Sequence, residues 1–333
     1  MDLGKVYFIG AGPGDPGLVT YKAMRKIEQA DVIIYDRLVN PVLLKLSKPE
    51  CKLIYVGKNP DVKYKKQDEI NAIINECAEQ YVTVVRLKGG DPGIFGRLTE
   101  EVESINNIPY EIIPGITSAS AAALYAGFPL TDRAYSPHVT FSTGHLQKDS
   151  VREIDFEALA KGGTLALYMG MKALPEIVEV LSRNDAHIKI AVIGHASYGF
   201  QKTVTGDLTN IISRVQKAQV THPAMIIIGD VVNCRKGASW FESLPEFQQS
   251  HLYISEEKID THDLIGQYER GGFYYAIDEI NCSQVQNKFR DVHEDVLRDR
   301  TFTHVHASSQ EALQTFEATY NIKFDHNIIT IKD

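Results

Sequence analysis

The sequence is poor in cysteine, and the few cysteines it has are widely spaced. Cys51, Cys77, Cys234 and Cys282 lie tens of residues apart and never pair as C-x-x-C. This spacing suggests neither a zinc knuckle nor a redox dithiol. We interpret the four residues as buried or idle thiols, and we expect no bound metal.

Long apolar runs are also missing. The longest, such as Ala224 to Ile228, fall far short of the roughly 20 residues that a membrane-spanning helix needs. The amino terminus, MDLGKVYFIGAGPG, leads directly into a strand and a glycine loop, without the charged and then apolar arrangement of a signal peptide. We therefore expect a cytoplasmic protein with no membrane role.

There is no excess of basic residues. The formal net charge is -8, whereas nonspecific nucleic-acid binding requires clustered Lys and Arg against phosphate. We expect no nucleic-acid partner. An acidic chain can still bind an anion through a locally basic cleft.

A chain of 333 residues is longer than one hydrophobic core usually organises, so two or three domains are expected. Residues 1–114 alternate strand and helix patterns, which predicts an α/β domain with a buried parallel sheet. The expected helices are Tyr21 to Gln29 and Gln67 to Glu79. The expected strands are Lys5 to Ile9, Asp31 to Tyr35, Lys52 to Val56, Thr83 to Leu87 and Glu111 to Ile113.

A break at Pro114-Gly115 predicts a hinge, followed by a second α/β domain over residues 115–235. We interpret Gly162-Gly163 and Gly206-Asp207 as its turns. Residues 236–250 contain the only Trp and are interpreted as a linker. Residues 251–333 predict a small third α/β unit. The expected elements of residues 115–333 are strands His138 to Ser142, Thr164 to Met169, Lys189 to Ile193, Ala224 to Ile228, His251 to Ile254, Phe273 to Ile277 and Thr303 to His306, and helices Ala173 to Ser182 and Gln310 to Tyr320.

The segment GAGPGDPG, Gly10 to Gly17, stands where a dinucleotide fold places its phosphate turn. The fingerprint G-x-G-x-x-G fails, because Asp15 occupies the place of the third glycine and a carboxylate repels pyrophosphate. Pro13 and Pro16 also lack the N–H groups that a phosphate cradle uses. The loop favours an uncharged or cationic ligand over NAD, and a plain tight turn is the alternative.

A second loop of this kind, LKGGDPGIFGR from Leu87 to Arg97, follows another predicted strand. Its glycines allow close approach of the backbone, and Asp91 supplies an acceptor for an amine or a ribose hydroxyl. Two such loops at the carboxyl ends of neighbouring strands define a ligand crevice in an open α/β sheet.

The ordered segments GAGPGDPG, YDRLV, VGK, VRLKGGDP, IPGITSA, GFPLT, TGH, YMGM and PAMIIIG resemble the uroporphyrinogen-III C-methyltransferases over about residues 3 to 235. The resemblance implies a two-domain tetrapyrrole methylase architecture with S-adenosylmethionine in the interdomain cleft. It also implies a homodimer. The implied reaction methylates C2 and then C7 of uroporphyrinogen III, giving precorrin-2 for sirohaem or corrinoid (cobalamin) biosynthesis.

The same resemblance implies where the cofactor binds. Small side chains and backbone groups suit a folded nucleoside, and a methionine offers a soft apolar contact. For Met169 taken alone, ordinary core packing is the alternative. The implied cofactor contacts are Pro13, Gly89, Gly90, Asp91, Ile94, Thr117, Ser118, Met169, Ala196 and Ala224.

The resemblance marks Asp36 in YDR as proton acceptor and Lys58 in VGK as proton donor. An electron-rich pyrrole carbon attacks the sulfonium methyl group, and an anion such as Asp36 can stabilise or remove the positive charge that moves onto the substrate. The alternative for Asp36 is a surface ion pair with Arg37.

The substrate that the resemblance implies carries eight carboxylates, so we expect its site to be locally basic. Arg37, Arg97 and Lys58 are the expected substrate contacts, because guanidinium and ammonium groups pair with carboxylates. The remaining cations near these segments are Lys63, Lys65, Lys66 and Arg133, for which a solvated face is the alternative.

The sequence departs from the family at several positions. Gly93 replaces an aromatic residue, and Leu98-Thr99 replace two glycines before Glu100-Glu101, which leaves substrate fit near this loop open. Gly194-His195 stands where a Glu-Arg or Glu-Asn pair is usual. We interpret His195 as a structural histidine, with a contact to the cofactor as the alternative.

The C-terminal segment weakly resembles one half of uroporphyrinogen-III synthase at Phe302 to Phe316. It is too short for that two-domain enzyme, so we interpret it as a reduced remnant without its own activity. His304 and His306 share one face of a strand, but two histidines without further ligands do not predict a metal site.

Two other functions remain open. The first is methylation of a later precorrin, by an enzyme that shares the glycine loop and the cofactor cleft. The second is a regulatory protein that binds tetrapyrrole without turnover. A nicotinamide dehydrogenase is disfavoured by Asp15.

Overall fold

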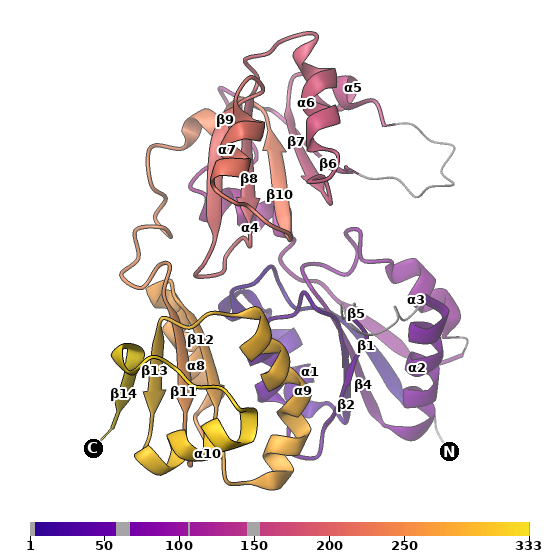
Figure 1. Cartoon of the computed structure of the whole chain (residues 1–333). Helices are drawn as coiled ribbons and strands as arrows, with labels where there is room; N and C mark the ends of the chain where they lie inside the picture. Colours follow the sequence, from indigo (N-terminus) through magenta and orange to yellow (C-terminus); the bar gives the residue numbers. More distant parts are fainter. Residues whose placement is uncertain (1–3, 58–66, 106, 145–153, 333) are drawn as a thin grey trace. The chain divides into compact units, whose positions relative to one another are not determined.

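The computed structural model describes residues 4–57, 67–105, 107–144 and 154–332. The chain divides into two compact units (Figure 1). The first combines residues 1–116 with residues 248–333, and the second comprises residues 117–247. The domain boundaries drawn from the sequence stay a prediction. In the structure, Gly115 belongs to the first unit, and the C-terminal segment packs within that unit.

Residues 4–116 form a five-stranded, fully parallel sheet. Its strand order is β3-β2-β4-β1-β5, so β1 and β4, which precede the two glycine loops, are neighbours. The prediction of parallel pairing is confirmed. The strands are β1 (Lys5–Gly10), β2 (Val32–Tyr35), β3 (Lys52–Tyr55), β4 (Thr83–Lys88) and β5 (Tyr110–Ile113).

The three inner strands of this sheet, β1, β2 and β4, are largely buried on both faces because helices cover each side (Figure 1). Ile70 and Ile74 of α2 pack with Phe8 and Ile34 on one face, and α1 covers the other. This explains the nearly continuous apolar runs of β1 and β2. The helical elements are η1 (Pro16–Leu18), α1 (Tyr21–Gln29), η2 (Pro41–Leu46), α2 (Gln67–Gln80) and α3 (Leu98–Ser104).

The C-terminal segment adds a second parallel sheet to the first unit, in the order β12-β11-β13-β14. The predicted strands and the helix Gln310 to Tyr320 are present within a residue of their expected ends. The elements are β11 (Ser250–Ile254), α8 (Thr261–Gly266), η4 (Gln267–Arg270), β12 (Phe273–Ile277), α9 (Ser283–Asp299), β13 (His304–Ala307), α10 (Gln310–Tyr320), η5 (His326–Ile328) and β14 (Ile329–Ile331).

The second unit has a mixed sheet, ordered β6-β7-β10-β8-β9. Only β6 and β7 pair in parallel, and the other pairs are antiparallel. One expectation is wrong: Gly206 and Asp207 end a strand rather than form a turn, since they pair with Ile190 and Lys189. The strands are β6 (Val139–Thr143), β7 (Thr164–Tyr168), β8 (Lys189–Gly194), β9 (Lys202–Asp207) and β10 (Ala224–Ile228).

Helices cover both faces of this mixed sheet. The alanines of α4 pack against Ala166, Ala191 and Ile227, while α6 and α7 pack on the opposite core cluster. The expected linker is not free of contacts, because the rings of Trp240 and Phe241 pack on Tyr125. The helical elements are α4 (Ser118–Tyr125), α5 (Phe156–Ala160), α6 (Leu174–Ser182), α7 (Ile211–Lys217) and η3 (Asp230–Cys234).

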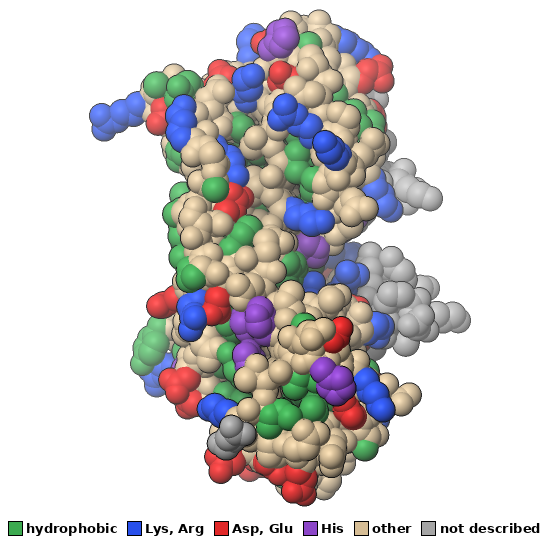
Figure 2. All heavy atoms as spheres, turned by 60° about the vertical axis from the view of Figure 1, so that its left-hand side comes forward, with side chains coloured by type: hydrophobic (Ala, Val, Ile, Leu, Met, Phe, Trp, Pro, Cys, Tyr) green, Lys and Arg blue, Asp and Glu red, His purple; other side chains and the backbone are tan. Residues whose placement is uncertain are grey.

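The described residues contain no helix long and apolar enough to cross a membrane. They also contain no group of three or more His, Cys, Asp or Glu side chains suited to a metal ion. On the face shown in Figure 2, coloured Lys and Arg side chains are interspersed with Asp and Glu side chains.

Candidate active site

The predicted cofactor loops of the first unit meet at a junction made of backbone. Gly12 and Gly90 form a pair of hydrogen bonds, 3.2 Å from Gly12 N to Gly90 O and 2.7 Å from Gly90 N to Gly12 O. A Cβ atom at Gly10 would lie 2.6 Å from both the Gly115 nitrogen and the Gly90 oxygen. The segments that follow β1, β4 and β5 therefore touch where only glycine fits.

Asp91 accepts hydrogen bonds from two of the segments that meet at this junction. Its Oδ1 accepts from Gly93 N at 2.8 Å, and its Oδ2 accepts from Gly115 N at 3.0 Å. The sequence alone suggested Asp91 as an acceptor for a ligand. In the structure both of its oxygens accept backbone N–H groups, so its first effect is to hold two loops together.

The Gly10–Gly17 loop does not lead directly into a long helix. Asp15 Oδ1 accepts from Gly17 N at 2.8 Å and caps the short η1, and α1 begins only at Tyr21. A dinucleotide site places pyrophosphate against the first turn of the following helix. The geometry therefore agrees with the exclusion of NAD that the sequence indicated.

Asp36 lies at the same sheet edge, directly after β2. Its Oδ1 accepts from Leu38 N at 3.0 Å, and its Oδ2 lies 3.7 Å from Arg86 Nη2. The sequence left an ion pair with Arg37 as the alternative for Asp36. In the structure, Asp36 instead pairs with Arg86, on the neighbouring strand. A Cβ at Gly89 would lie 2.6 Å from the Cβ of Leu38, so the Asp36 turn contacts the second glycine loop.

Beneath Asp36 lies a buried charge network, which we call the β4 cluster: Arg86, Lys88 and Glu101. Glu101 Oε1 lies 3.1 Å from Arg86 Nε, and Glu101 Oε2 lies 2.7 Å from Lys88 Nζ. All three side chains are less than one tenth exposed. Burial lowers the pKa of Lys88, with the charge of Arg86 acting in the same direction and Glu101 opposing both.

The sequence analysis assigned no role to the β4 cluster. Arg86 and Lys88 alternate with apolar residues in a strand whose residues are all buried except the first. Charged residues are almost never fully buried unless they are paired. The two cations within a predicted central strand are therefore the sequence feature that could have indicated the β4 cluster.

Arg97, which precedes α3, is hydrogen-bonded to a carboxylate of that helix. Its Nε and Nη2 donate to the two carboxylate oxygens of Glu100 at 2.9 and 2.6 Å. This hydrogen bonding raises the pKa of Arg97 and lowers that of Glu100. Arg97 is about half exposed and has a positive φ of 55°.

Arg37 is exposed at the Asp36 turn, and Ile94 lies in the loop after Asp91.

Lys58 lies outside the described residues, as do Lys63, Lys65 and Lys66. The proton-donor role of Lys58 and its substrate contact stay predictions. Arg133 is described and lies in the second unit, in a turn closed by Asp132 and Ser136.

The second unit gathers its predicted cofactor residues at one sheet edge. Met169 follows β7, Ala196 follows β8, and Ala224 begins the antiparallel β10 between them. Thr117 and Ser118 begin α4, and the Thr117 hydroxyl lies 2.6 Å from the Tyr168 hydroxyl. Tyr168 was part of the YMGM motif but received no role from sequence. It anchors the start of α4 beside Met169.

Met169 has an unusual conformation for an apolar residue. Its side chain is 55% exposed and its φ is 56°. Core packing, the alternative reading of this residue, is excluded by that exposure. A non-glycine residue in the left-handed region is uncommon and is concentrated at functional sites.

His195 also has a positive φ, of 49°, and its ring packs against Phe200 at 5.2 Å. Its Nε2 lies 3.4 Å from the Thr221 hydroxyl. These contacts agree with the structural role that we expected.

These features define a class. An open α/β sheet with glycine loops and a carboxylate at the carboxyl edge of its strands is typical of an enzyme that binds a small ligand at that edge. The sequence matches the tetrapyrrole (corrin/porphyrin) methylases over residues 5–212, more than half of the chain. The chain belongs to the tetrapyrrole methylase family.

Individual relatives agree with this assignment. The chain is 41% identical to a uroporphyrinogen-III C-methyltransferase of Bacillus subtilis, over all of this chain and 69% of that protein. It is 48% identical to one from Priestia megaterium, over 69% of this chain and 99% of that protein. A structure of the Thermus thermophilus uroporphyrin-III C-methyltransferase, complexed with S-adenyl homocysteine, has a TM-score of 0.59 and 35% identity, covering 69% of this chain and 93% of that one.

Proposed function

We propose that this tetrapyrrole methylase transfers methyl groups from S-adenosylmethionine to C2 and then C7 of uroporphyrinogen III, giving precorrin-2. The observation that carries the proposal is the position of Asp36 beside the glycine junction, at one edge of the first sheet. The family and the names of the relatives support the substrate class and the cofactor.

The glycine junction suits S-adenosylmethionine. Gly10, Gly90 and Gly115 let three loops pack backbone against backbone, and Asp15 and Asp91 place carboxylates within these loops. That chemistry fits an uncharged nucleoside and a cationic group better than a phosphate. When bound, the cofactor supplies an electrophilic methyl group on a positively charged sulfur.

Asp36 acts on the charge that reaches the substrate. As the pyrrole carbon forms its bond to the methyl carbon, the bond to sulfur breaks and positive charge moves onto the tetrapyrrole. A carboxylate held by Leu38 N and Arg86 is pre-oriented to stabilise that charge and to accept the proton that the ring then loses.

Arg37 and Arg97 bind the carboxylates of the substrate. Arg37 is exposed beside Asp36, and Arg97 presents a guanidinium at the end of the second glycine loop. Because Glu100 occupies two donors of Arg97, three N–H groups of that guanidinium are left for other acceptors.

The test is incubation of the purified chain with uroporphyrinogen III and methyl-labelled S-adenosylmethionine. A product carrying two labelled methyl groups is expected. Absence of methylation, with turnover of a precorrin instead, would make the chain a methylase of a later step. Binding of tetrapyrrole without any turnover would make it a regulatory protein.

Asp36→Asn tests the acid–base assignment. General-base catalysis contributes about 10² to 10⁴ in rate, so kcat should fall by about that factor while S-adenosylhomocysteine still binds. Asp185→Asn is the matched control, since Asp185 also accepts one backbone N–H but lies in the second unit at an exposed turn. Unchanged kcat in Asp36→Asn would refute the role of Asp36.

The homodimer and the cytoplasmic location belong to this proposal as well. They rest on the family resemblance alone. Light scattering of the purified chain at a concentration near that of the assay gives the oligomeric state, and a monomeric mass would refute the dimer.

A further inference from the structure

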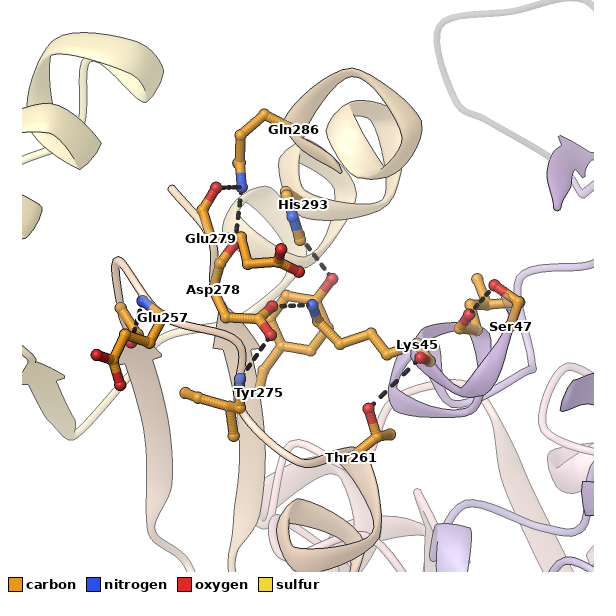
Figure 3. A network of polar contacts seen from close by, with 12 residues as sticks. Lys45, Ser47, Glu257, Thr261, Tyr275, Asp278, Glu279, Gln286 and His293 are labelled. Carbon is orange, nitrogen blue, oxygen red and sulfur yellow. Dashed lines mark hydrogen bonds and ion pairs between the residues drawn. The ribbon is translucent and has the colours of Figure 1, made fainter. Parts of the chain in front are cut away.

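Residues 248–333 are joined to the methylase sheet domain by a buried ion pair. Lys45 Nζ of η2 lies 2.5 Å from Asp278 Oδ1, just after β12, and both side chains are less than one tenth exposed (Figure 3). The ammonium also lies 4.8 Å from the ring centre of Phe289. The other Asp278 oxygen accepts from Ile259 N at 2.9 Å. The carboxylate is therefore held from two sides.

The C-terminal segment also binds the far end of η2. Lys288 Nζ of α9 donates to the Ser47 hydroxyl at 2.9 Å and to the Lys48 carbonyl at 2.7 Å. The Thr261 hydroxyl donates to the Lys45 carbonyl at 3.4 Å (Figure 3). Carbonyl groups at the end of a helical turn have no partner within it, and here the C-terminal segment supplies one.

The near end of η2 touches the Gly10–Gly17 loop. Asn40 caps η2, with its Oδ1 accepting from Val42 N at 3.0 Å. Its Nδ2 donates to the Gly14 carbonyl at 2.7 Å, in the middle of the loop. Asn40 is 2% exposed, so this bond is shielded from water. Removing one partner of a buried hydrogen bond leaves the other partner unsatisfied and is therefore destabilising.

The C-terminal segment reaches Asn40 directly as well. The Tyr268 hydroxyl of η4 lies 3.4 Å from Asn40 Nδ2 and donates its own hydrogen to the Tyr274 carbonyl at 2.7 Å. An amide nitrogen has two hydrogens. One serves Gly14 and the other Tyr268, so both donors of Asn40 are used.

We propose that residues 248–333 position the Gly10–Gly17 loop for the cofactor, with Tyr268 and Asn40 as positioning residues and the Lys45–Asp278 pair fixing η2 between them. The inference rests on the proposed function only in taking this loop as a cofactor contact. It gives the C-terminal segment a role in methyl transfer that does not require activity of its own.

The test compares two tyrosines of the same segment in the full-length protein. Tyr268→Phe removes the hydroxyl next to Asn40. Tyr275→Phe, the matched control, removes an equally buried hydroxyl that contacts His293 and keeps the ring that lies 6.0 Å from Lys45 Nζ. Binding of S-adenosylhomocysteine is measured by calorimetry, and KM and kcat by methyl transfer.

We expect Tyr268→Phe to raise Kd and the KM for S-adenosylmethionine about three- to tenfold, with kcat at saturation unchanged. Amide hydrogen exchange at residues 10–17 should become faster in the unliganded protein. Tyr275→Phe should leave Kd and exchange in the loop as in the wild type. Asp278→Asn, which breaks the ion pair, should change the loop in the same direction as Tyr268→Phe.

The proposal is wrong if folded Tyr268→Phe binds S-adenosylhomocysteine as the wild type does, or if Tyr275→Phe weakens binding equally. These outcomes are separate from failure of the proposed function. A wild-type chain that binds S-adenosylhomocysteine but does not methylate uroporphyrinogen III would refute the substrate assignment and leave the positioning test intact.

Discussion

Arg86 of β4 and Asp36, directly after the neighbouring strand β2, face each other with 3.7 Å between Nη2 and Oδ2. Arg86 is itself fixed by Glu101 and by the carbonyl groups of Ile34 and Leu87. Asp36, which the proposed reaction needs at the surface, is thereby oriented by the buried residues Arg86 and Glu101.

Glu101→Gln should lower the free energy of unfolding by about 3 to 5 kcal/mol, because it leaves Arg86 and Lys88 buried without their carboxylate. Glu100→Gln, at the adjacent position, breaks an exposed pair with Arg97 and should cost about 1 kcal/mol or less. Urea unfolding of both variants measures the difference. Equal losses would show that the β4 cluster is not a buried network.

Gly115→Ala should disrupt the glycine junction, since the new Cβ would clash with the Gly90 carbonyl oxygen and the Gly10 Cα. Backbone must move to relieve the clash, so we expect weaker binding of S-adenosylhomocysteine, by at least tenfold, and lower stability. Gly266→Ala is the control, because nothing lies within 4 Å of its added Cβ. Calorimetric titration tests both, and unchanged affinity in Gly115→Ala would contradict the junction.

Met169→Gly tests whether the Met169 side chain contributes to cofactor binding, because it removes that side chain and also relieves the strain of the positive φ. A left-handed conformation costs a non-glycine residue about 1 to 2 kcal/mol, so this variant should be as stable as the wild type or more stable, yet bind S-adenosylhomocysteine more weakly. Gln219→Gly relieves a similar positive φ of 50° at an exposed position and should leave binding unchanged. Retained affinity in Met169→Gly would remove Met169 from the cofactor site.

His293 should make the stability of the chain depend on pH. It is fully buried against Tyr275 and Phe289, and burial, helped by Lys45, lowers its pKa well below the usual 6.5. The folded state therefore stays neutral where the unfolded state takes up a proton. As pH falls below about 6.5, this residue should reduce stability by up to about 1.4 kcal/mol per pH unit.

Urea unfolding between pH 7.5 and pH 5.5 measures that slope. His293→Phe should flatten it, whereas replacing the exposed His326 by Gln should not. An identical slope in all three proteins would assign the pH dependence to other groups.

Local patterns predicted most of the fold because they depend on few neighbours. The apolar runs of β1 and β2 indicated strands covered on both faces, and Tyr21 to Gln29 is the helix that was expected. The strand β9 was missed because Gly206 and Asp207 are typical turn residues. Here pairing with β8 outweighs their local preference.

The site was predictable as a set of segments and not as a set of contacts. Sequence order placed Gly89, Asp91 and Asp36 after parallel strands, which puts them at one sheet edge. The sequence did not reveal that Asp91 accepts from Gly115 N or that Asn40 donates to the Gly14 carbonyl. These bonds join residues that are far apart in the chain, and no periodic sequence pattern links them.

The first unit is assembled from two stretches separated by the whole of the second unit. The ribosome makes the earlier stretch first, so Lys45 is synthesised before Asp278, its partner in the ion pair. The second unit must be synthesised before the ion pair can form. The contacts between the C-terminal segment and η2, and with them the proposed positioning of the Gly10–Gly17 loop, can form only after residues 248–333 have been synthesised.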